Sequence, residues 1–257
     1  MHQSAVEGYN RPETIDAYQV ARPSYHPDGI AELVGRLTGL DTVVEVGAGT
    51  GILSRELVAA GIDVTATEPV AAMRAALTAA LPATTCLDAT AEDLPFDDNS
   101  VDAIVAAQSF HWFDYGPALD EFHRVLRPDG RLLLIWNVRD EAVDWMQRFT
   151  TIVTDPTGTT PRHRTMKWRD AIEADARFAP LDDWTVDNPW PTTRQGVVDR
   201  ALSVSFVAAM PPADQTAIAD QIAALVATMT EPFDFPYRTE INETRPRPAG
   251  QRSNFDA

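Results

Sequence analysis

Short apolar runs alternate with segments of helical periodicity over the first 140 residues. The apolar runs predict buried strands at 42–46, 63–67, 85–87, 101–107 and 131–137. Apolar residues recur at helical spacing in 28–40, 50–60, 71–80 and around 118–126, and RPDG at 127–130 predicts a turn. Strands that alternate with helices and are apolar along their whole length predict a parallel sheet covered on both faces.

The last third of the chain follows a different pattern. Strand-like segments at 184–186 and 236–242 flank two predicted helices, at about 194–209 and 212–229. Because the helical pair interrupts the two strands, we expect an insertion that caps the sheet.

Composition narrows the class of protein. The 257 residues carry 21 basic and 38 acidic side chains, a formal net charge of −17, and such a surface repels nucleic-acid phosphates. The single cysteine, Cys86, excludes an intramolecular disulfide framework. The amino terminus lacks the pattern of a secretory signal, and no apolar stretch is long enough to span a bilayer. We expect a cytoplasmic protein that binds neither nucleic acid nor membrane.

A glycine-rich bend carries the most informative chemistry. Gly47, Gly49 and Gly51 lie between a predicted strand and helix, where missing β-carbons let the backbone approach a ligand. The spacing is G-x-G-x-G, with Ile52 where a dinucleotide fingerprint has its third glycine. Glu68 ends the second strand, where a carboxylate can accept from both ribose hydroxyls. Ribose recognition alone fits NAD or a nucleoside, and the spacing disfavours NAD.

Several motifs in order resemble the class I S-adenosylmethionine-dependent methyltransferases, in their type 11 small-molecule branch. E-V-G-A-G-T-G resembles the family's first motif, and T-E-P the acidic end of its second strand. A-T-A-E-D-L-P-F-D-D-N-S-V-D and H-R-V-L-R-P-D-G-R-L-L-L resemble its adenine-side loop and the approach to strand five. Y-x-x-x-R-P-x-Y, A-Q-S-F-H-W-F and W-N-x-R-D are similar to a subgroup that includes enzymes like trans-aconitate methyltransferases.

The resemblance covers about residues 18–140 and implies an α/β, Rossmann-like fold. The expected sheet has seven strands and is mostly parallel, with an antiparallel last strand and a helical insertion capping the active site. We expect one methyltransferase domain with a mobile tail, divided as follows: 1–243 for the domain, 1–40 for the N-terminal cap and first helix, 42–140 for the cofactor-binding core, about 190–230 for the insertion, and 244–257 for the tail.

The resemblance also implies roles toward S-adenosyl-L-methionine. Glu45 and the glycine bend would hold the methionine end, Arg22 would pair with its carboxylate, and Tyr18 would close over it. Gln108 would lie beside the methionine moiety. Ala91, through its backbone, and Glu92 would contact the adenine. Just before them, Thr90 stands where many relatives have an Asp that accepts from the adenine amine. The full set of implied cofactor-binding residues is Tyr18, Arg22, Glu45, Gly47, Ala48, Gly49, Gly51, Glu68, Pro69, Ala91, Glu92 and Gln108.

Methyl transfer from a sulfonium is an in-line displacement that depends mainly on alignment of the nucleophile. A base is needed only where the nucleophile must lose a proton. His111 is the candidate, because it follows strand four at the edge of the sheet where ligands bind. The alternative is that His111 only packs against or caps the next helix. The five histidines show no metal-ligand spacing, so no metal is expected.

Other candidates could contact the acceptor, each with a structural alternative. Trp112 could wall an aromatic substrate, or pack in the core. Arg139 could grip a substrate carboxylate, or form a local ion pair with Asp140. Ser203 and Phe206 of the insertion could face the pocket or the core. The full set of candidate substrate-binding residues is Tyr25, Trp112, Trp136, Arg139, Ser203 and Phe206.

We therefore expect methyl transfer to a small molecule, with an oxygen nucleophile such as a carboxylate or a phenol. Two alternatives stay open: a nicotinamide-dependent oxidoreductase, and a nucleoside-binding protein that has lost its chemistry. The sequence does not fix the oligomeric state.

Overall fold

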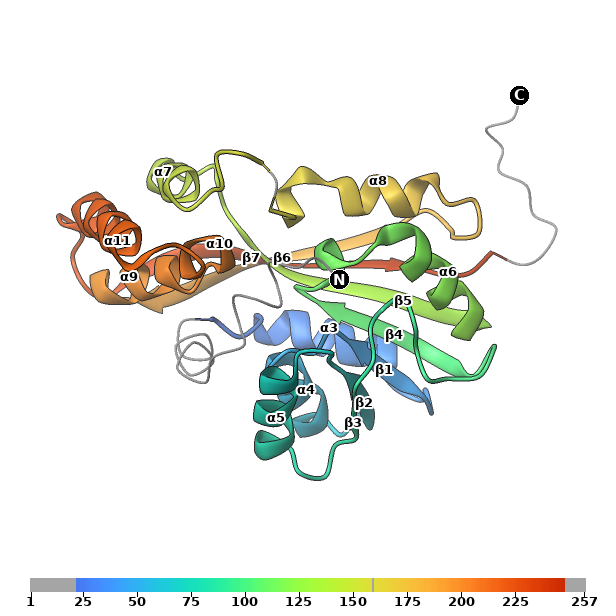
Figure 1. Ribbon diagram of the computed structural model, residues 1–257. Helices are drawn as coiled ribbons and strands as arrows, with labels where there is room; N and C mark the ends of the chain where they lie inside the picture. The colour runs from blue at the N-terminus through green and yellow to red at the C-terminus, as the bar shows by residue number, and fades with distance from the viewer. Residues whose placement is uncertain (1–21, 159, 248–257) are drawn as a thin grey trace.

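A seven-stranded sheet organises the protein in the computed structural model, which describes residues 22–158 and 160–247 (Figure 1). The strand order is β3-β2-β1-β4-β5-β7-β6. The five strands β1 to β5 pair in parallel, whereas β7 lies antiparallel between β5 and β6. The strands are β1 Val43–Val46, β2 Val64–Thr67, β3 Cys86–Leu87, β4 Val101–Ala107, β5 Leu126–Arg139, β6 Asp182–Thr192 and β7 Phe233–Thr244. The predicted fold class is confirmed, including the antiparallel last strand.

Helices cover both faces of the sheet because the central strands are apolar on both sides. Along β4, Ala103 and Val105 pack toward α3 and α4, whereas Ile104 and Ala106 pack toward α6 and α8. The helices that come before β6 in the chain are α3 Pro27–Leu37, α4 Ile52–Ala59, α5 Ala71–Ala80, η1 Phe110–Trp112, α6 Tyr115–Val125, α7 Asp144–Ile152, η2 His163–Thr165 and α8 Lys167–Ala174.

One apolar cluster lies on each face of the sheet, and a third lies beyond one end of the sheet, within a cap of helices. Between β6 and β7 the chain forms α9 Arg194–Leu202, α10 Ser205–Ala208 and α11 Pro212–Val226. These helices pack with α7 around Phe235 and Tyr237 of β7, and Figure 1 shows all four at the same end of the sheet. We call α7, α9, α10 and α11 the helical cap.

Three details differ from the sequence-based expectations. Val101 pairs with Leu126 and Ala103 with Arg131, so the predicted turn at 127–130 is a bulge within β5. Two helices, α7 and α8, were not predicted, because each buries only two or three side chains and lacks a continuous apolar stripe.

The end of the chain also departs from the expected tail. Thr244 belongs to β7, and Pro246 forms a bridge with Phe178. Arg247 is hydrogen-bonded to the backbone of 177–178. The remaining residues of the predicted tail, 248–257, lie outside the described part of the chain.

Gly51 ends the glycine bend and precedes the first residue of α4, with a φ of +79°. This left-handed conformation costs a residue with a β-carbon about 1–2 kcal/mol. A β-carbon at this position would also lie 2.9 Å from Leu77 Cγ. Gly51 is therefore required by the backbone where the helix begins.

We predict that Gly51→Ala lowers the free energy of unfolding by about 2 kcal/mol, because it adds strain and a clash. Gly35→Ala is the matched control, since Gly35 lies within α3 and its β-carbon would meet nothing within 4 Å. That control should leave stability unchanged or raise it by up to about 1 kcal/mol. Urea denaturation measures both, and equal effects of the two substitutions would contradict this role.

Candidate active site

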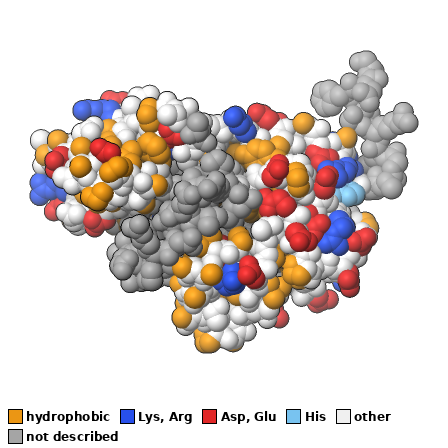
Figure 2. Space-filling view, viewed as in Figure 1, with side chains coloured by type: hydrophobic (Ala, Val, Ile, Leu, Met, Phe, Trp, Pro, Cys, Tyr) orange, Lys and Arg blue, Asp and Glu red, His pale blue; other side chains and the backbone are white. Residues whose placement is uncertain are grey.

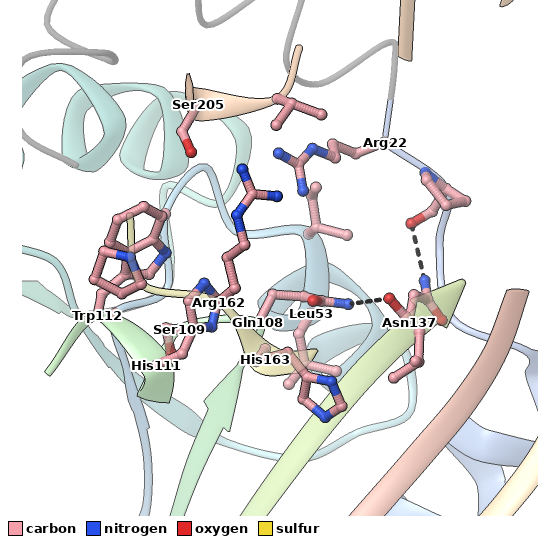
Figure 3. A pocket seen from close by; sticks show the side chains of 18 of the residues that line it. Arg22, Leu53, Gln108, Ser109, His111, Trp112, Asn137, Arg162, His163 and Ser205 are labelled. Atoms are coloured by element: carbon pink, nitrogen blue, oxygen red, sulfur yellow. Dashed lines mark hydrogen bonds between the residues drawn. The ribbon is translucent and has the colours of Figure 1, made fainter. Parts of the chain in front are cut away.

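A cavity opens at the carboxyl ends of the parallel strands, between the glycine bend and the helical cap. Its walls include the residues that follow β1, β2 and β4, which are Gly47, Glu68 and Gln108. Parallel α/β sheets bind ligands at this edge because the strand order reverses there and a crevice opens. Figure 3 shows Gln108, His111 and Arg162 around the same space, with Ser205 of the cap above them.

The glycine bend is held against the end of β2 by the backbone. The N–H groups of Gly47 and Ala48 both donate to the carbonyl of Thr67, at 2.9 and 3.0 Å. A β-carbon on Gly47 would lie 2.9 Å from Ser109 Cβ, so the bend passes too close to the segment after β4 for a larger residue. Gly49 has a φ of +58° and its N–H donates to Glu68 Oε2 at 2.8 Å.

Glu68 is fixed as an acceptor at the floor of the cavity. Its second oxygen, Oε1, accepts from the N–H of Val70 at 2.8 Å, and 3% of the residue is exposed. Burial raises the pKa of its carboxyl group, while these two backbone donors act in the opposite direction. Two fixed donors orient the carboxylate, and its remaining lone pairs can accept from a pair of hydroxyl groups.

Glu45 is a buried carboxyl group in which one oxygen has no hydrogen-bond partner. Ser54 Oγ donates to its Oε2, whereas its Oε1 is buried and has no hydrogen-bond partner in the structure. Burial raises the pKa of Glu45 to about 8, and the nearby Glu68 adds to the effect. An acceptor without a donor, on the wall of a cavity, fits a ligand that brings a donor.

The segment that follows β4 is held in an uncommon backbone conformation. Gln108 has a φ of +55°, which is strained for a residue with a side chain. Its amide donates to the carbonyl of Asn137 at 3.3 Å (Figure 3), and Asn137 Nδ2 donates to the carbonyl of Ser24 at 3.0 Å. The ends of β4 and β5 and the segment before α3 are thereby joined at the cavity.

His111 lies in η1 and reaches the cavity wall. Its ring centroid is 5.0 Å from that of Trp112 and 5.6 Å from that of Trp136, and its Nδ1 is buried with no hydrogen-bond partner. Burial lowers the pKa of His111 to about 3, and the nearby charges of His163, Arg22 and Arg162 act in the same direction. The imidazole is therefore neutral at physiological pH and is a weak proton acceptor.

The structure brings most of the predicted cofactor and substrate residues to one cavity. Those that line it are Arg22, Tyr25, Glu45, Gly47, Ala48, Gly49, Glu68, Gln108, His111, Trp112 and Arg139. Arg139 does not pair with Asp140, whose carboxylate lies 3.9 Å from Arg238 instead. The Arg139 guanidinium lies 5.0 Å from the ring centroid of Phe149.

Other predicted residues do not reach the cavity. Trp136 is fully buried behind His111 and donates its indole N–H to Asn242 at 3.0 Å. Ser203 points to Arg200, and Phe206 packs in the core of the cap.

Several predicted cofactor residues also lie elsewhere. Ala91 belongs to the core, and Glu92 accepts from the N–H of Asp114 at 3.0 Å. Four predicted residues therefore do not line the cavity: Ala91, Glu92, Pro69 and Gly51. Tyr18 lies outside the described residues.

Sequence reasoning missed three arginines and a histidine of the cavity. Arg162, His163 and Arg164 come from the segment before α8, and Arg200 comes from α9. These residues lie far along the chain from the glycine bend and have no motif around them. The one signal available was that Arg200 lies on the otherwise apolar buried face of its helix, with Val197, Val198 and Ala201.

Two structural surveys give negative results for the described residues. Within 22–158 and 160–247, no three histidine, cysteine or acidic side chains come together in a way that could hold a metal ion. None of the helices in that same part of the chain is long and apolar enough to cross a bilayer.

Comparisons with known proteins agree with this geometry. Residues 44–134 match the family model described as a methyltransferase domain. The chain is 38% identical over 217 residues to an uncharacterized methyltransferase of Mycobacterium tuberculosis, covering 83% of this chain and 84% of the relative. It is 35% identical over 143 residues to an uncharacterized methyltransferase of Schizosaccharomyces pombe, covering 54% of this chain and 57% of that protein.

Solved structures show the same fold. The YcgJ protein of Bacillus subtilis has a TM-score of 0.58 at 17% identity, covering 87% of this chain and all of that one (100%). Haemonchus contortus phosphoethanolamine N-methyltransferase 2, solved with S-adenosylhomocysteine, has a TM-score of 0.53 at 12% identity, covering 91% of this chain and 57% of that one. The sheet order, the glycine bend and these relatives together lead to one conclusion: the chain belongs to the class I S-adenosylmethionine-dependent methyltransferases.

Proposed function

We propose that this methyltransferase esterifies a carboxylate of a small-molecule acceptor. The observation that carries the proposal is the apolar setting of His111, the one candidate base predicted at the end of β4. Its ring packs beside Trp112 and Trp136 with Nδ1 buried and without a hydrogen-bond partner, and this burial lowers its pKa to about 3. A general base works best with a pKa near the working pH, which this imidazole does not have. A carboxylate is already ionised at neutral pH and needs no base, whereas a phenol, with a pKa of about 10, does.

The residues of the cavity fit S-adenosyl-L-methionine. The orphaned Glu45 Oε1 suits an ammonium donor, the fixed carboxylate of Glu68 suits ribose hydroxyls, and Arg22 suits a carboxylate. A β-carbon on Gly49 would meet only Met73 Sδ, at 3.8 Å, so the bend leaves open space there. When bound, the cofactor supplies an electrophilic methyl carbon on a sulfonium.

The remaining groups of the cavity hold and align the acceptor. We assign His111 as an orienting group, since its neutral ring can donate or accept one hydrogen bond without changing charge. Trp112 and the strained Gln108 would limit where an acceptor can lie. Alignment of nucleophile and leaving group can supply much of the rate of an in-line displacement. Figure 2 shows acidic side chains spread over the described part of one face of the molecule. The net charge of −17 and the single cysteine support a small-molecule reaction in the cytoplasm.

Membership of the methyltransferase family removes the nicotinamide alternative and favours an enzyme over a binding protein. The choice between carboxylate and phenol is the part that needs an experiment. Esters and ethers differ in chemical stability, so the product itself can distinguish them.

We predict that a screen with tritiated methyl donor yields a product that releases volatile methanol in base, because a carboxyl methyl ester is hydrolysed there. The panel should contain carboxylates, phenols, amines and thiols, with boiled enzyme as the control. A base-stable methylated phenol or amine as the best product would contradict carboxylate esterification while leaving methyl transfer intact.

We predict that binding of S-adenosylhomocysteine releases a proton from Glu45. The free carboxyl has a pKa of about 8, with Glu68 and Arg55 as its charged neighbours, and pairing with an ammonium lowers that pKa. Affinity should therefore rise as the pH rises from 6 to 8 and level off above. Calorimetry at pH 7 in buffers of different ionisation enthalpy should show release of about one proton.

Glu45→Gln should abolish this release, whereas Glu173→Gln is a control that removes an exposed carboxylate from α8. Proton release that persists in Glu45→Gln would show that Glu45 does not meet the ammonium group.

We predict that His111→Ala lowers kcat by about tenfold to a hundredfold through misalignment, and leaves S-adenosylhomocysteine affinity unchanged. His111→Gln should restore part of the rate. At saturating cofactor, kcat should show no ionisation near pH 6.5, since the pKa of His111 lies near 3. An ionisation near pH 6.5 that disappears in His111→Gln would identify His111 as a base after all.

A further inference from the structure

Three arginines from separate parts of the chain line the cavity. Arg139 ends β5, Arg162 precedes η2, and Arg200 belongs to α9 of the helical cap. Figure 3 shows the guanidinium of Arg162 beside that of Arg22, in the open space below Ser205. The fold therefore gathers positive charge in a chain whose net charge is −17.

All the hydrogen-bond partners found for Arg162 and Arg200 are neutral. Arg162 Nη2 donates to the carbonyl of Val153 at 3.3 Å. Arg200 Nε donates to the hydroxyl of Tyr237 at 2.7 Å, and its Nη1 donates to Ser203 Oγ at 3.2 Å.

Ion pairing with carboxylates, common elsewhere in the molecule, is missing here. Arg36, Arg124 and Arg177 each pair with at least two carboxylates at the surface. Over residues 22–158 and 160–247, by contrast, neither Arg139 nor Arg162 nor Arg200 forms an ion pair. Among the described arginines, Arg55, Arg148 and Arg247 also form no ion pair, but these three do not line the cavity.

Burial and mutual repulsion make the cluster unfavourable without a counter-charge. Burial lowers the pKa of Arg200 to about 10, and the nearby Arg22 and Arg139 act in the same direction. The pKa of Arg139 is also lowered, first by burial and then by Arg22 and Arg162. Asp155 is the one acidic neighbour found for the cluster: its charge raises the pKa of Arg162 against the effect of burial, but the two form no ion pair. Buried charges cost stability unless they are paired, so a cluster like this indicates a site for a ligand.

The acidic residues that line the cavity do not pair with the cluster. Glu45 and Glu68 belong to the glycine bend, where the cofactor is proposed to lie. Glu141 lies 3.5 Å from Arg164 and forms an ion pair with it. With Arg22 assigned to the cofactor carboxylate, three guanidiniums remain for the acceptor.

We propose that Arg139, Arg162 and Arg200 form a subsite for a doubly charged anionic group on the acceptor, either a phosphate or a pair of carboxylates. This inference rests on the proposed function, because it places the acceptor beside the cofactor site. One reacting carboxylate satisfies one guanidinium, which leaves two positive charges for the rest of the molecule. The planar donor fork of arginine matches the oxygens of both kinds of anion.

The test titrates the enzyme, saturated with S-adenosylhomocysteine, with simple anions at constant ionic strength. The probes are inorganic phosphate, glutarate as the dicarboxylate, and butyrate as the monocarboxylate. Calorimetry should show at least tenfold tighter binding of phosphate or glutarate than of butyrate. A preference for phosphate points to a phosphorylated acceptor, and a preference for glutarate points to a polycarboxylate.

Arg162→Gln and Arg200→Gln should each weaken binding of the preferred dianion at least tenfold. Arg162→Gln is the safer variant, since Arg200 holds buried hydrogen bonds that folding could require. Arg148→Gln is the matched control, because it removes an exposed charge from α7 of the same cap.

Two kinds of failure can be told apart. Equal binding of dianions and butyrate, or equal effects of Arg162→Gln and Arg148→Gln, would overturn the subsite alone. Binding of S-adenosylhomocysteine to the wild-type protein is measured by calorimetry before the anions are added. Failure to bind it would overturn the proposed function, and with it this inference.

Discussion

The site depends on how the ends of β1 and β2 are joined. Two N–H groups of the glycine bend donate to the carbonyl of Thr67, and a third, from Gly49, donates to Glu68. These bonds place a backbone with three glycines beside an oriented carboxylate, at the edge where the parallel strands end. Gly47 is too close to Ser109 for a larger residue, so the same bend also fixes the segment that carries His111.

Charge divides the cavity into two halves with different chemistry. The half beside the glycine bend carries the carboxyl groups of Glu45 and Glu68. Glu45 is buried, one of its oxygens has no hydrogen-bond partner, and its pKa is raised. The half beside the helical cap carries guanidinium groups such as those of Arg139 and Arg200, which form no ion pair with a carboxylate of the described residues. A cationic cofactor end and an anionic acceptor would meet where these halves adjoin, and neither requires His111 to carry a proton.

The amino-terminal half of the site could be predicted from sequence because local rules determine it. A buried strand that ends in glycines, followed one strand later by Glu68, leaves few alternatives for the chain. The seven strands and the antiparallel β7 followed from the family resemblance, whereas the order of the strands was not predicted. Trp136 was placed wrongly, since position at the end of a strand does not say which face of the sheet a side chain takes. Arg162 and Arg200 could not be predicted to lie there, because only tertiary packing brings 160–164 and α9 to the sheet edge.

The central claim is that the crevice between the glycine bend and Glu68 holds the adenosyl and methionine parts of the cofactor. The most direct measurement is a crystal structure of the protein grown with S-adenosylhomocysteine. The account predicts ribose hydroxyls within hydrogen-bond distance of Glu68 and the amino group within reach of Glu45. Density for the nucleoside at any other place, with this crevice filled by protein side chains, would contradict it.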